Sequence, residues 1–528
     1  MKILISDPLA KEGVSILKAE PEFIVEEKTG LKPEQLKEFI QDADALIVRS
    51  QTTVTSDLIN AAQKLRVIAR AGVGVDNVDV EAATKKGIVV MNTPGGNTLS
   101  TAEHTFSMML ALSRNIPQAN ASMREGKWDR KKYTGVELCG KTLGVIGLGR
   151  IGLEVAKRAI AFQMKVIASD PFLSPEKASK YDIEPVDLDT LYSRADYISI
   201  HTPMTSDTKG MINAEVIQKM KKGVRIINCA RGGIIKEKDL YDALISGWVA
   251  GAALDVYEEE PPTGSPLLDL PNVIATPHLG AATAEAQINV AIEIAHQVIQ
   301  ALKHSTILNA VNAPSLDSEL MKQLGPLLLL GEKLGLMLAQ LLTGHLKKII
   351  IKYEGNVSEF DVRLISLSVI KGLLGHALQE SVTIVNAPVL AKERGIQLEE
   401  TKSAVAEDFA DLIHVEALSN NEAVSVAGTL FGKKKEPRIV WINNYRVDAE
   451  PTGYLLVLSN DDKPGMVARI SAILENNQIN IAAMTVGRDK PGGRAVTVIN
   501  VDSAISDPAL AQIAKVKHVI GVKSVIFK

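Results

Sequence analysis

The sequence predicts an α/β protein of several domains, and three observations support this fold class. Over the first three hundred residues, short β-rich runs alternate with amphipathic segments, which is typical of parallel sheets with crossover helices. A proline-containing segment, NAPSL (312–316), ends this pattern. From Gly453 the predicted order is βαββαβ, the ferredoxin-like motif. We therefore expect two Rossmann-like parallel-sheet domains, an α+β intervening domain and a ferredoxin-like βαββαβ domain.

Length, charge and cysteine content set the broad class. A chain of 528 residues is too long for one core and predicts three or four domains. The net charge of −3 argues against a nucleic-acid binder, which usually carries a basic excess. Only two cysteines, Cys139 and Cys229, are present, which excludes a disulfide framework and favours a reducing compartment. The N-terminal apolar run lacks the length of a signal peptide, and glycine and charged residues interrupt the apolar cluster at 327–342, so we expect a cytoplasmic protein without a membrane partner.

The first parallel-sheet domain is predicted from four strand-like runs, KILIS (2–6), ALIVRS (45–50), VIARAG (67–72) and IVVMN (88–92). A helix is expected over 98–114, where Ser100 and Glu103 have the spacing of a capping box. The helical segment after the second unit is expected to run back to the first. The first domain would then be discontinuous and comprise 1–96 plus 283–312.

The second domain is predicted over 97–282. It begins with the strand and turn TLGVIGLGRIG (142–152). Its further strand-like runs are 165–170, 197–201, 224–229, 251–256 and 272–276.

Beyond 312 the pattern predicts an intervening domain over 313–448 and a final domain over 449–528. In the intervening domain we expect helices and short strands in mixed order. The expected helices are 318–343, 362–379 and 402–413, and the expected strands are 347–353, 423–428 and 437–443. No catalytic constellation stands out in this segment.

The run GLGRIG (147–152) matches the dinucleotide-binding pattern G-x-G-x-x-G, which on its own is a weak signal. Here it follows a β-run and opens a helix. In that context Gly147 permits the tight turn, Gly149 lets the backbone approach a pyrophosphate, and Gly152 allows close packing of helix and strand. The helix N-terminus near Arg150 and Ile151 offers N–H groups and a favourable dipole to phosphate.

An acidic residue, Asp170, ends the next strand-like run. Its carboxylate should accept hydrogen bonds from the ribose hydroxyls and repel a 2′-phosphate, so the sequence favours NAD over NADP. The alternative interpretation is a glycine turn with no ligand. The combination of strand, glycine spacing and acid makes that alternative the weaker one.

Three side chains downstream suit the oxidation of a 2-hydroxy acid, which needs a base and a cation for the carboxylate. Arg231 follows a strand-like run and has the fork that binds both carboxylate oxygens. His278 follows another run and titrates near neutrality, and Glu260 could orient it and raise its pKa. Taken singly, each is more simply explained as a surface or structural residue. Their joint placement after successive strands of one sheet favours the catalytic interpretation.

The chain resembles the D-isomer-specific 2-hydroxyacid dehydrogenases. The motifs that carry this resemblance occur in order and are GLGRIG (147–152), HTP (201–203), NCARGG (228–233), GAALDVYEEEPP (251–262) and TPHLGA (276–281). VRSQTTVT (48–55), RAGVGVDNVD (70–79) and the C-terminal extension make it similar to the long branch of the family, which oxidises 3-phospho-D-glycerate to 3-phosphohydroxypyruvate in L-serine biosynthesis. The resemblance implies that Arg231, Glu260 and His278 are catalytic and that metal plays no part.

The resemblance also implies the positions that line the NAD site, namely Val73, Arg150, Ile151, Asp170, Thr202, Cys229, Ala230, Arg231 and Asp255. Val73 stands where many relatives have threonine, at the cost of one hydrogen bond. The substrate phosphate needs cations, and Arg49 and Arg70 end strands of the first domain. The basic cluster 130–132 could reach the cleft from a neighbouring subunit, or be a solvated loop. Asn97 could touch the substrate's carboxyl end, or be only a turn or cap residue.

The final domain resembles an ACT domain, a small-molecule sensor that pairs with a second copy. Asn460, Asp462 and Asn480 stand at the positions that contact the effector in serine-sensing relatives. L-Serine is therefore a possible effector, and a dimerisation module without effector is the alternative. The family implies a homo-oligomer, expected to be a tetramer. Two other functions stay open at this stage: a glyoxylate or hydroxypyruvate reductase, and a non-catalytic NAD-sensing scaffold.

Overall fold

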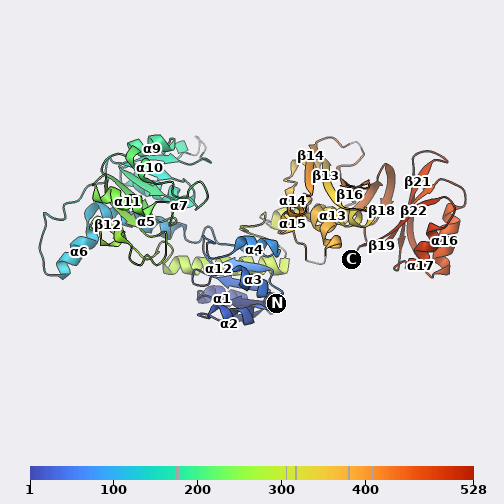
Figure 1. Ribbon diagram of the computed structural model, residues 1–528, viewed down its shortest axis with the longest axis horizontal. Helices are drawn as coiled ribbons and strands as arrows, with labels where there is room; N and C mark the ends of the chain where they lie inside the picture. The colour runs from blue at the N-terminus through green and yellow to red at the C-terminus, as the bar shows by residue number, and fades with distance from the viewer. Residues whose placement is uncertain (174–177, 305, 315–317, 379–380, 407, 528) are drawn as a thin grey trace.

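The computed structural model describes residues 1–173, 178–304, 306–314, 318–378, 381–406 and 408–527. Figure 1 shows four regions in a row, each built around its own sheet. The region around the second sheet lies at one end, followed by those around the first, third and fourth sheets. The predicted fold class, two parallel-sheet domains followed by an α+β and a ferredoxin-like domain, is confirmed.

The first sheet is parallel throughout, with strand order β2-β1-β3-β4-β5. Its strands are β1 (Lys2–Ile5), β2 (Ile24–Glu27), β3 (Ala45–Val48), β4 (Val67–Arg70) and β5 (Val89–Met91). Its helices are α1 (Lys11–Lys18), α2 (Pro33–Ile40), α3 (Ser56–Ala61) and α4 (Val80–Lys85). The four predicted strands are present. The edge strand β2 was missed, because its exposed IVEE run lacks the continuous apolar character of a buried parallel strand.

Two long helices cross between the first and second sheets: α5 (Thr98–Arg114) leaves the first sheet, and α12 (Ala284–His304) returns to it. Helix α12 packs on α1 so closely that a Cβ added to Gly13 would lie 2.4 Å from the Ala291 carbonyl oxygen. The predicted helix 98–114 is confirmed, but its capping box is wrong. The N-cap is Asn97, and the Ser100 hydroxyl instead bonds Thr283 Oγ1 at 2.8 Å.

The second sheet is also parallel, with order β12-β11-β10-β9-β6-β7-β8. Its strands are β6 (Thr142–Ile146), β7 (Lys165–Ser169), β8 (Glu184–Pro185), β9 (Tyr197–Ile200), β10 (Val224–Asn228), β11 (Val249–Leu254) and β12 (Val273–Ala275). Its further helices are α6 (Ile116–Arg124), α7 (Arg150–Ala161), α9 (Leu188–Arg194), α10 (Ala214–Lys219), α11 (Glu237–Ile245) and the 3-10 turn η1 (Pro266–Asp269). The strand order reverses between β6 and β9, and ligands of such sheets bind at the carboxyl ends beside that point.

The third sheet is mixed, with order β14-β13-β15-β16-β17-β18. Its strands are β13 (Leu346–Gly355), β14 (Gln397–Ser403), β15 (Asp411–Ser419), β16 (Ala423–Phe431), β17 (Glu436–Ile442) and β18 (Tyr445–Ala449). Its helices are α13 (Ser318–Leu341), α14 (Arg363–Ala377), α15 (Ala387–Glu393) and the 3-10 turn η2 (Asn356–Glu359).

The helix expected over 402–413 is wrong, because its ends belong to β14 and β15. This stretch contains three alanines, which favour helix, but pairing of both strands with β13 overrides that propensity. Residue 407 lies outside the described part of the chain. The other predicted helices and strands of this region are present, with residue 379 of the 362–379 helix also outside the described part.

Helix α13 carries the one span among the described residues, 321–341, that is long and apolar enough to cross a membrane. Half of that span is buried within the protein. Its apolar face, with Leu330, Leu334 and Met337 fully buried, packs against α14 and the third sheet. We therefore describe it as the core helix of this domain.

The fourth sheet is antiparallel, with order β20-β21-β19-β22, and confirms the predicted βαββαβ domain. Its elements are β19 (Gly453–Asp461), α16 (Met466–Asn476), β20 (Ile481–Arg488), β21 (Arg494–Val501), α17 (Asp507–Ala514) and β22 (Val519–Phe527). One face packs on α16 and α17. The other face, which includes Leu455, Val457 and Phe527, joins the same hydrophobic cluster as α13. The last domain is thus docked on the third one by apolar burial.

Glycines let α13 and α14 pack backbone to backbone. A Cβ added to Gly335 would lie 2.0 Å from the Val369 carbonyl oxygen, and one added to Gly372 would lie 2.0 Å from that of Glu332. We predict that Gly335→Ala lowers the midpoint of thermal unfolding, because the overpacking costs about 1–3 kcal/mol. Gly325→Ala in the same helix is the control, since no heavy atom lies within 4 Å of its added Cβ. An unchanged midpoint for Gly335→Ala would contradict this packing.

Candidate active site

The turn after β6 has the geometry of a phosphate-binding loop. Gly147 has φ +88°, and a Cβ there would lie 2.7 Å from the His201 carbonyl oxygen. A Cβ on Gly152 would lie 2.1 Å from the carbonyl oxygen of Gly147. Both positions therefore require glycine. At Gly149 no heavy atom lies within 4 Å of an added Cβ, so the backbone faces open space where a pyrophosphate would approach.

Asp170 lies at the end of β7 and holds this loop. One carboxylate oxygen accepts the Leu148 N–H at 2.7 Å, and the other accepts the Phe172 N–H at 2.7 Å. Each oxygen keeps a lone pair for a ribose hydroxyl. Next to the loop, the buried Thr202 hydroxyl has no hydrogen-bond partner among the described residues. An unpartnered buried hydroxyl is costly unless a ligand or water satisfies it, so these residues fit a dinucleotide.

Arg231 lies in the turn after β10 and faces the first sheet. Its Nη1 donates to the Ala230 carbonyl at 2.7 Å, and its Nε lies 3.0 Å from the Asp76 carboxylate, in the loop after β4. The buried Asn228 side chain shapes this turn by donating to the Arg231 carbonyl at 2.9 Å and accepting the Ala230 N–H at 3.1 Å. Asp76 carried no signal in the sequence, because only the folded chain brings it to Arg231.

His278 and Glu260 form the predicted pair. The imidazole Nδ1 lies 2.8 Å from Glu260 Oε2, and Glu260 Oε1 accepts the Tyr257 N–H at 3.2 Å. The bond to Glu260 raises the pKa of His278, although burial opposes this rise. Burial alone would raise the pKa of Glu260, but its bond to His278 lowers it below its usual value. With Nδ1 carrying the proton, Nε2 has the lone pair that a general base needs.

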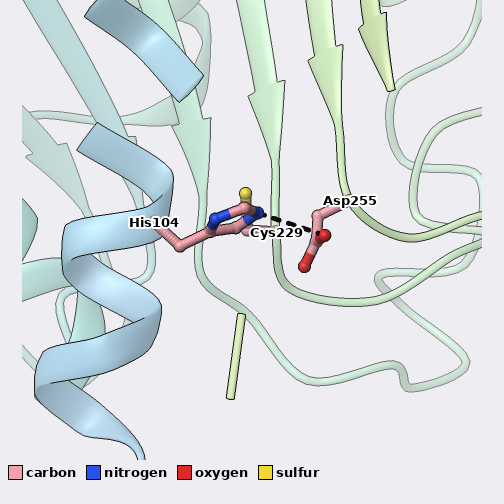
Figure 2. Close-up of side chains that lie close together, drawn as sticks. All are labelled: His104, Cys229 and Asp255. Atoms are coloured by element: carbon pink, nitrogen blue, oxygen red, sulfur yellow. Dashed lines mark ion pairs between the residues drawn. The ribbon is translucent and has the colours of Figure 1, made fainter. Parts of the chain in front are cut away.

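Asp255 follows β11 and is fully buried. Its carboxylate accepts the Thr276 hydroxyl at 2.6 Å and the N–H groups of Leu279 and Gly280 at 2.7 and 2.8 Å. His104 Nε2, from α5, lies 3.1 Å from the same carboxylate (Figure 2). Burial would raise the pKa of Asp255, but the bonds from His104, Thr276 and Leu279 lower it. The NAD contact expected at Asp255 stays a prediction. The four protein donors leave little room for a further donor on this carboxylate.

Cys229 completes the group drawn in Figure 2, and it could in principle form a metal site with His104 and Asp255. Burial raises the pKa of the Cys229 thiol to about 12, which disfavours the thiolate that binds metal. Three of the four donors to Asp255 converge on Oδ1 and the fourth, the Gly280 N–H, binds Oδ2, which leaves little of this carboxylate for a metal. The group is therefore poorly suited to a metal ion.

The predicted substrate cations lie at the ends of β3 and β4. Burial, and next the positive charge of Arg231, lower the pKa of Arg70 to about 10. Arg70 Nε is buried without a partner among the described residues. Arg49 contributes further positive charge there and donates to the Pro8 carbonyl at 3.3 Å. Arg49, Arg70 and Arg231 thus concentrate positive charge at one place, which suits a substrate with two anionic groups.

Asn97 and Val73 are two further predicted positions. Asn97 is the N-cap of α5 but makes no capping bond, and its buried Oδ1 has no partner among the described residues. This leaves its side chain free for a ligand. Val73 contributes a carbonyl that accepts the Asn92 amide at 2.5 Å.

The basic cluster 130–132 does not join this site within one chain. It follows α6, which Figure 1 places at the far end of the second-sheet region, away from the first sheet.

The predicted effector residues are only partly brought together. Asn460 and Asp462 line one cavity of about 530 Å³ with the turn 463–468. Asp462 is held by Arg488 Nη1 at 3.1 Å and the Gly492 N–H at 3.0 Å. Asn480 lies outside this lining and donates to Asp502 at 2.7 Å.

Three family matches cover most of the chain. Residues 106–280 match the NAD-binding domain of the D-isomer specific 2-hydroxyacid dehydrogenases. Residues 323–443 match the D-3-phosphoglycerate dehydrogenase intervening domain, and residues 454–518 match the ACT domain. The fold and the site thus define a D-isomer-specific 2-hydroxyacid dehydrogenase.

Similar proteins narrow this class. D-3-phosphoglycerate dehydrogenase of Archaeoglobus fulgidus is 44% identical over 98% of this chain and 99% of its own length. The Bacillus subtilis protein of the same name is 42% identical over 99% of both. The chain belongs to the D-3-phosphoglycerate dehydrogenase family.

Solved structures match the first two domains. The TT0316 protein of Thermus thermophilus matches with a TM-score of 0.55 and 35% identity, covering 59% of this chain and 100% of that one. D-Lactate dehydrogenase from Aquifex aeolicus, complexed with NAD and lactic acid, matches with a TM-score of 0.52 and 29% identity, covering 60% and 100%.

The His278–Glu260 bond yields a pH prediction. Because Glu260 raises the pKa of His278, we expect Glu260→Gln to lower it, so that the imidazole loses its proton at lower pH. NMR titration of the His278 imidazole, assigned by its loss in His278→Ala, measures this. Glu259→Gln is the matched control, since the neighbouring Glu259 makes no bond to His278 in the described part of the chain. Equal titration midpoints for wild type and Glu260→Gln would show that the pair does not set this pKa.

Proposed function

We propose that the protein oxidises 3-phospho-D-glycerate to 3-phosphohydroxypyruvate with NAD, the first step of L-serine biosynthesis. The observation that carries this proposal is the His278–Glu260 pair, which lies at the carboxyl edge of the dinucleotide sheet together with Arg231. Family membership and the curated names of relatives that match over nearly the full chain support it.

The side chains divide the chemistry between them. Arg231 binds the substrate carboxylate and polarises the developing carbonyl. His278 Nε2 accepts the hydroxyl proton as the O–H bond breaks and the C2=O bond forms, and Glu260 stabilises the resulting imidazolium. The C2–H bond breaks with both electrons leaving as hydride, and bound NAD would supply the hydride acceptor. The proton on His278 then returns to solvent.

The phosphate distinguishes this reaction from that of a glyoxylate or hydroxypyruvate reductase. Arg70 and Arg49 would supply the charge that a phosphate needs, and the unpartnered Asn97 Oδ1 would be available to the carboxyl end. A non-catalytic NAD-sensing scaffold would not need the oriented His278–Glu260 pair. Turnover that His278→Ala abolishes would exclude the scaffold.

We predict that Arg70→Ala lowers kcat/KM for 3-phosphoglycerate by about 10²-fold, because a charge-assisted phosphate contact contributes about 1.5–3 kcal/mol. NADH formation by wild type and variant measures this, and reduction of glyoxylate by NADH should be much less affected. Arg66→Ala is the control, because Arg66 is exposed and lies directly before β4. Turnover that does not change in Arg70→Ala would favour the reductase alternative.

We further propose that L-serine binds in the Asn460–Asp462 cavity and inhibits turnover. Asp462 offers a carboxylate to the amino acid's ammonium group. Asp462→Asn should weaken inhibition by about 10-fold or more, because it removes that charge while keeping an acceptor for Arg488. Asp507→Asn, at the start of α17, is the control. If serine has no effect on wild type, the domain is an assembly module or senses another ligand.

A homo-oligomer, expected to be a tetramer, fits the exposed surface after α5. Met123 and Trp128 are 53% and 76% exposed, and such apolar surface is usually covered by a partner. The cluster 130–132 would then be carried toward a neighbouring subunit. We also propose a cytoplasmic protein, which fits two free cysteines.

A further inference from the structure

The loop 276–283, which carries His278, is held by one polar face of helix α5. Ser100 bonds the Thr283 hydroxyl at 2.8 Å, and the Thr101 hydroxyl donates to the Gly280 carbonyl at 3.1 Å. His104 Nε2 lies 3.2 Å from Thr276 Oγ1. These three α5 residues are spaced so that they share one helix face. Helix α5 thus hydrogen-bonds the loop near its start, its middle and its end.

Asp255 joins the two elements. It binds the N–H groups of Leu279 and Gly280, directly after His278, and it receives His104 from α5 (Figure 2). His278 itself has φ +55°, a left-handed conformation that is unfavourable for a non-glycine residue. Such a conformation persists only where its surroundings hold it, and the bonds to Asp255 are the adjacent restraint.

We infer that His104 is a positioning residue for His278, acting through Asp255. The His104 Nε2–H group hydrogen-bonds the fully buried Asp255 carboxylate. This bond fixes the orientation in which the carboxylate binds the loop. Because α5 crosses from the first sheet to the second, the same contact ties His278 to the segment that links the two domains. This inference rests on the proposed function for His278.

The test compares His104→Leu with wild type. We expect kcat for 3-phosphoglycerate oxidation to fall about 10-fold or more, while KM for NAD and substrate changes less than about twofold, because a displaced base impairs the chemical step and leaves ligand contacts intact. His104→Gln retains a donor and should recover much of the loss. His296→Leu, the same substitution at an exposed helical histidine, should have no effect.

Hydrogen–deuterium exchange gives a readout that does not depend on turnover. The amides of 279–280 should exchange faster in His104→Leu than in wild type and should be protected again in His104→Gln. Wild-type kcat and exchange in His104→Leu would overturn the inference, as would activity lost to a chelator and restored by zinc. If wild type itself does not turn over 3-phosphoglycerate, the proposed function fails, while the exchange result still decides the role of His104.

Discussion

The arrangement of the site depends on one buried carboxylate. Asp255 is fully inaccessible to solvent, and an unpaired carboxylate there would cost several kcal/mol. Its donors come from α5, from the end of β12 and from the loop beyond His278. The hydrogen bonds to this carboxylate therefore hold three separate segments together. The packing of these segments sets the position of the His278 imidazole.

An ion pair also joins the two parallel-sheet domains. Arg231 reaches across from the second sheet to Asp76, beside the buried Arg70 of the first. Beyond the cleft, a single hydrophobic cluster runs from the first sheet through α13 and α14 to the fourth sheet. The turn that leads into helix α15 adds hydrogen bonds from Thr383 to the Gly87 carbonyl and from Asn386 to the Lys85 carbonyl, at and just beyond the end of α4. The intervening domain is thus in direct contact with the domain that carries Arg49 and Arg70, and the ACT domain is joined to them through the intervening domain.

Much of this was predictable from sequence, for identifiable reasons. Buried parallel strands are continuous apolar runs, so most were located, and GLGRIG with Asp170 indicated its loop because glycine is sterically required at 147 and 152. The helix over 402–413 was wrong because strand pairing overrode local propensity. Asp76 and His104 gave no signal, because contacts between distant segments leave no spacing pattern in the chain.

Hydride transfer from C2 of the substrate to NAD can be measured directly with an isotope label. Purified protein would be given NAD and 3-phospho-D-glycerate deuterated at C2, and the reduced cofactor would be examined by mass spectrometry. We expect NADH that carries the deuterium, together with slower turnover than with unlabelled substrate if hydride transfer limits the rate. Absence of reduced cofactor, or reduced cofactor without deuterium, would contradict oxidation at C2 by this site.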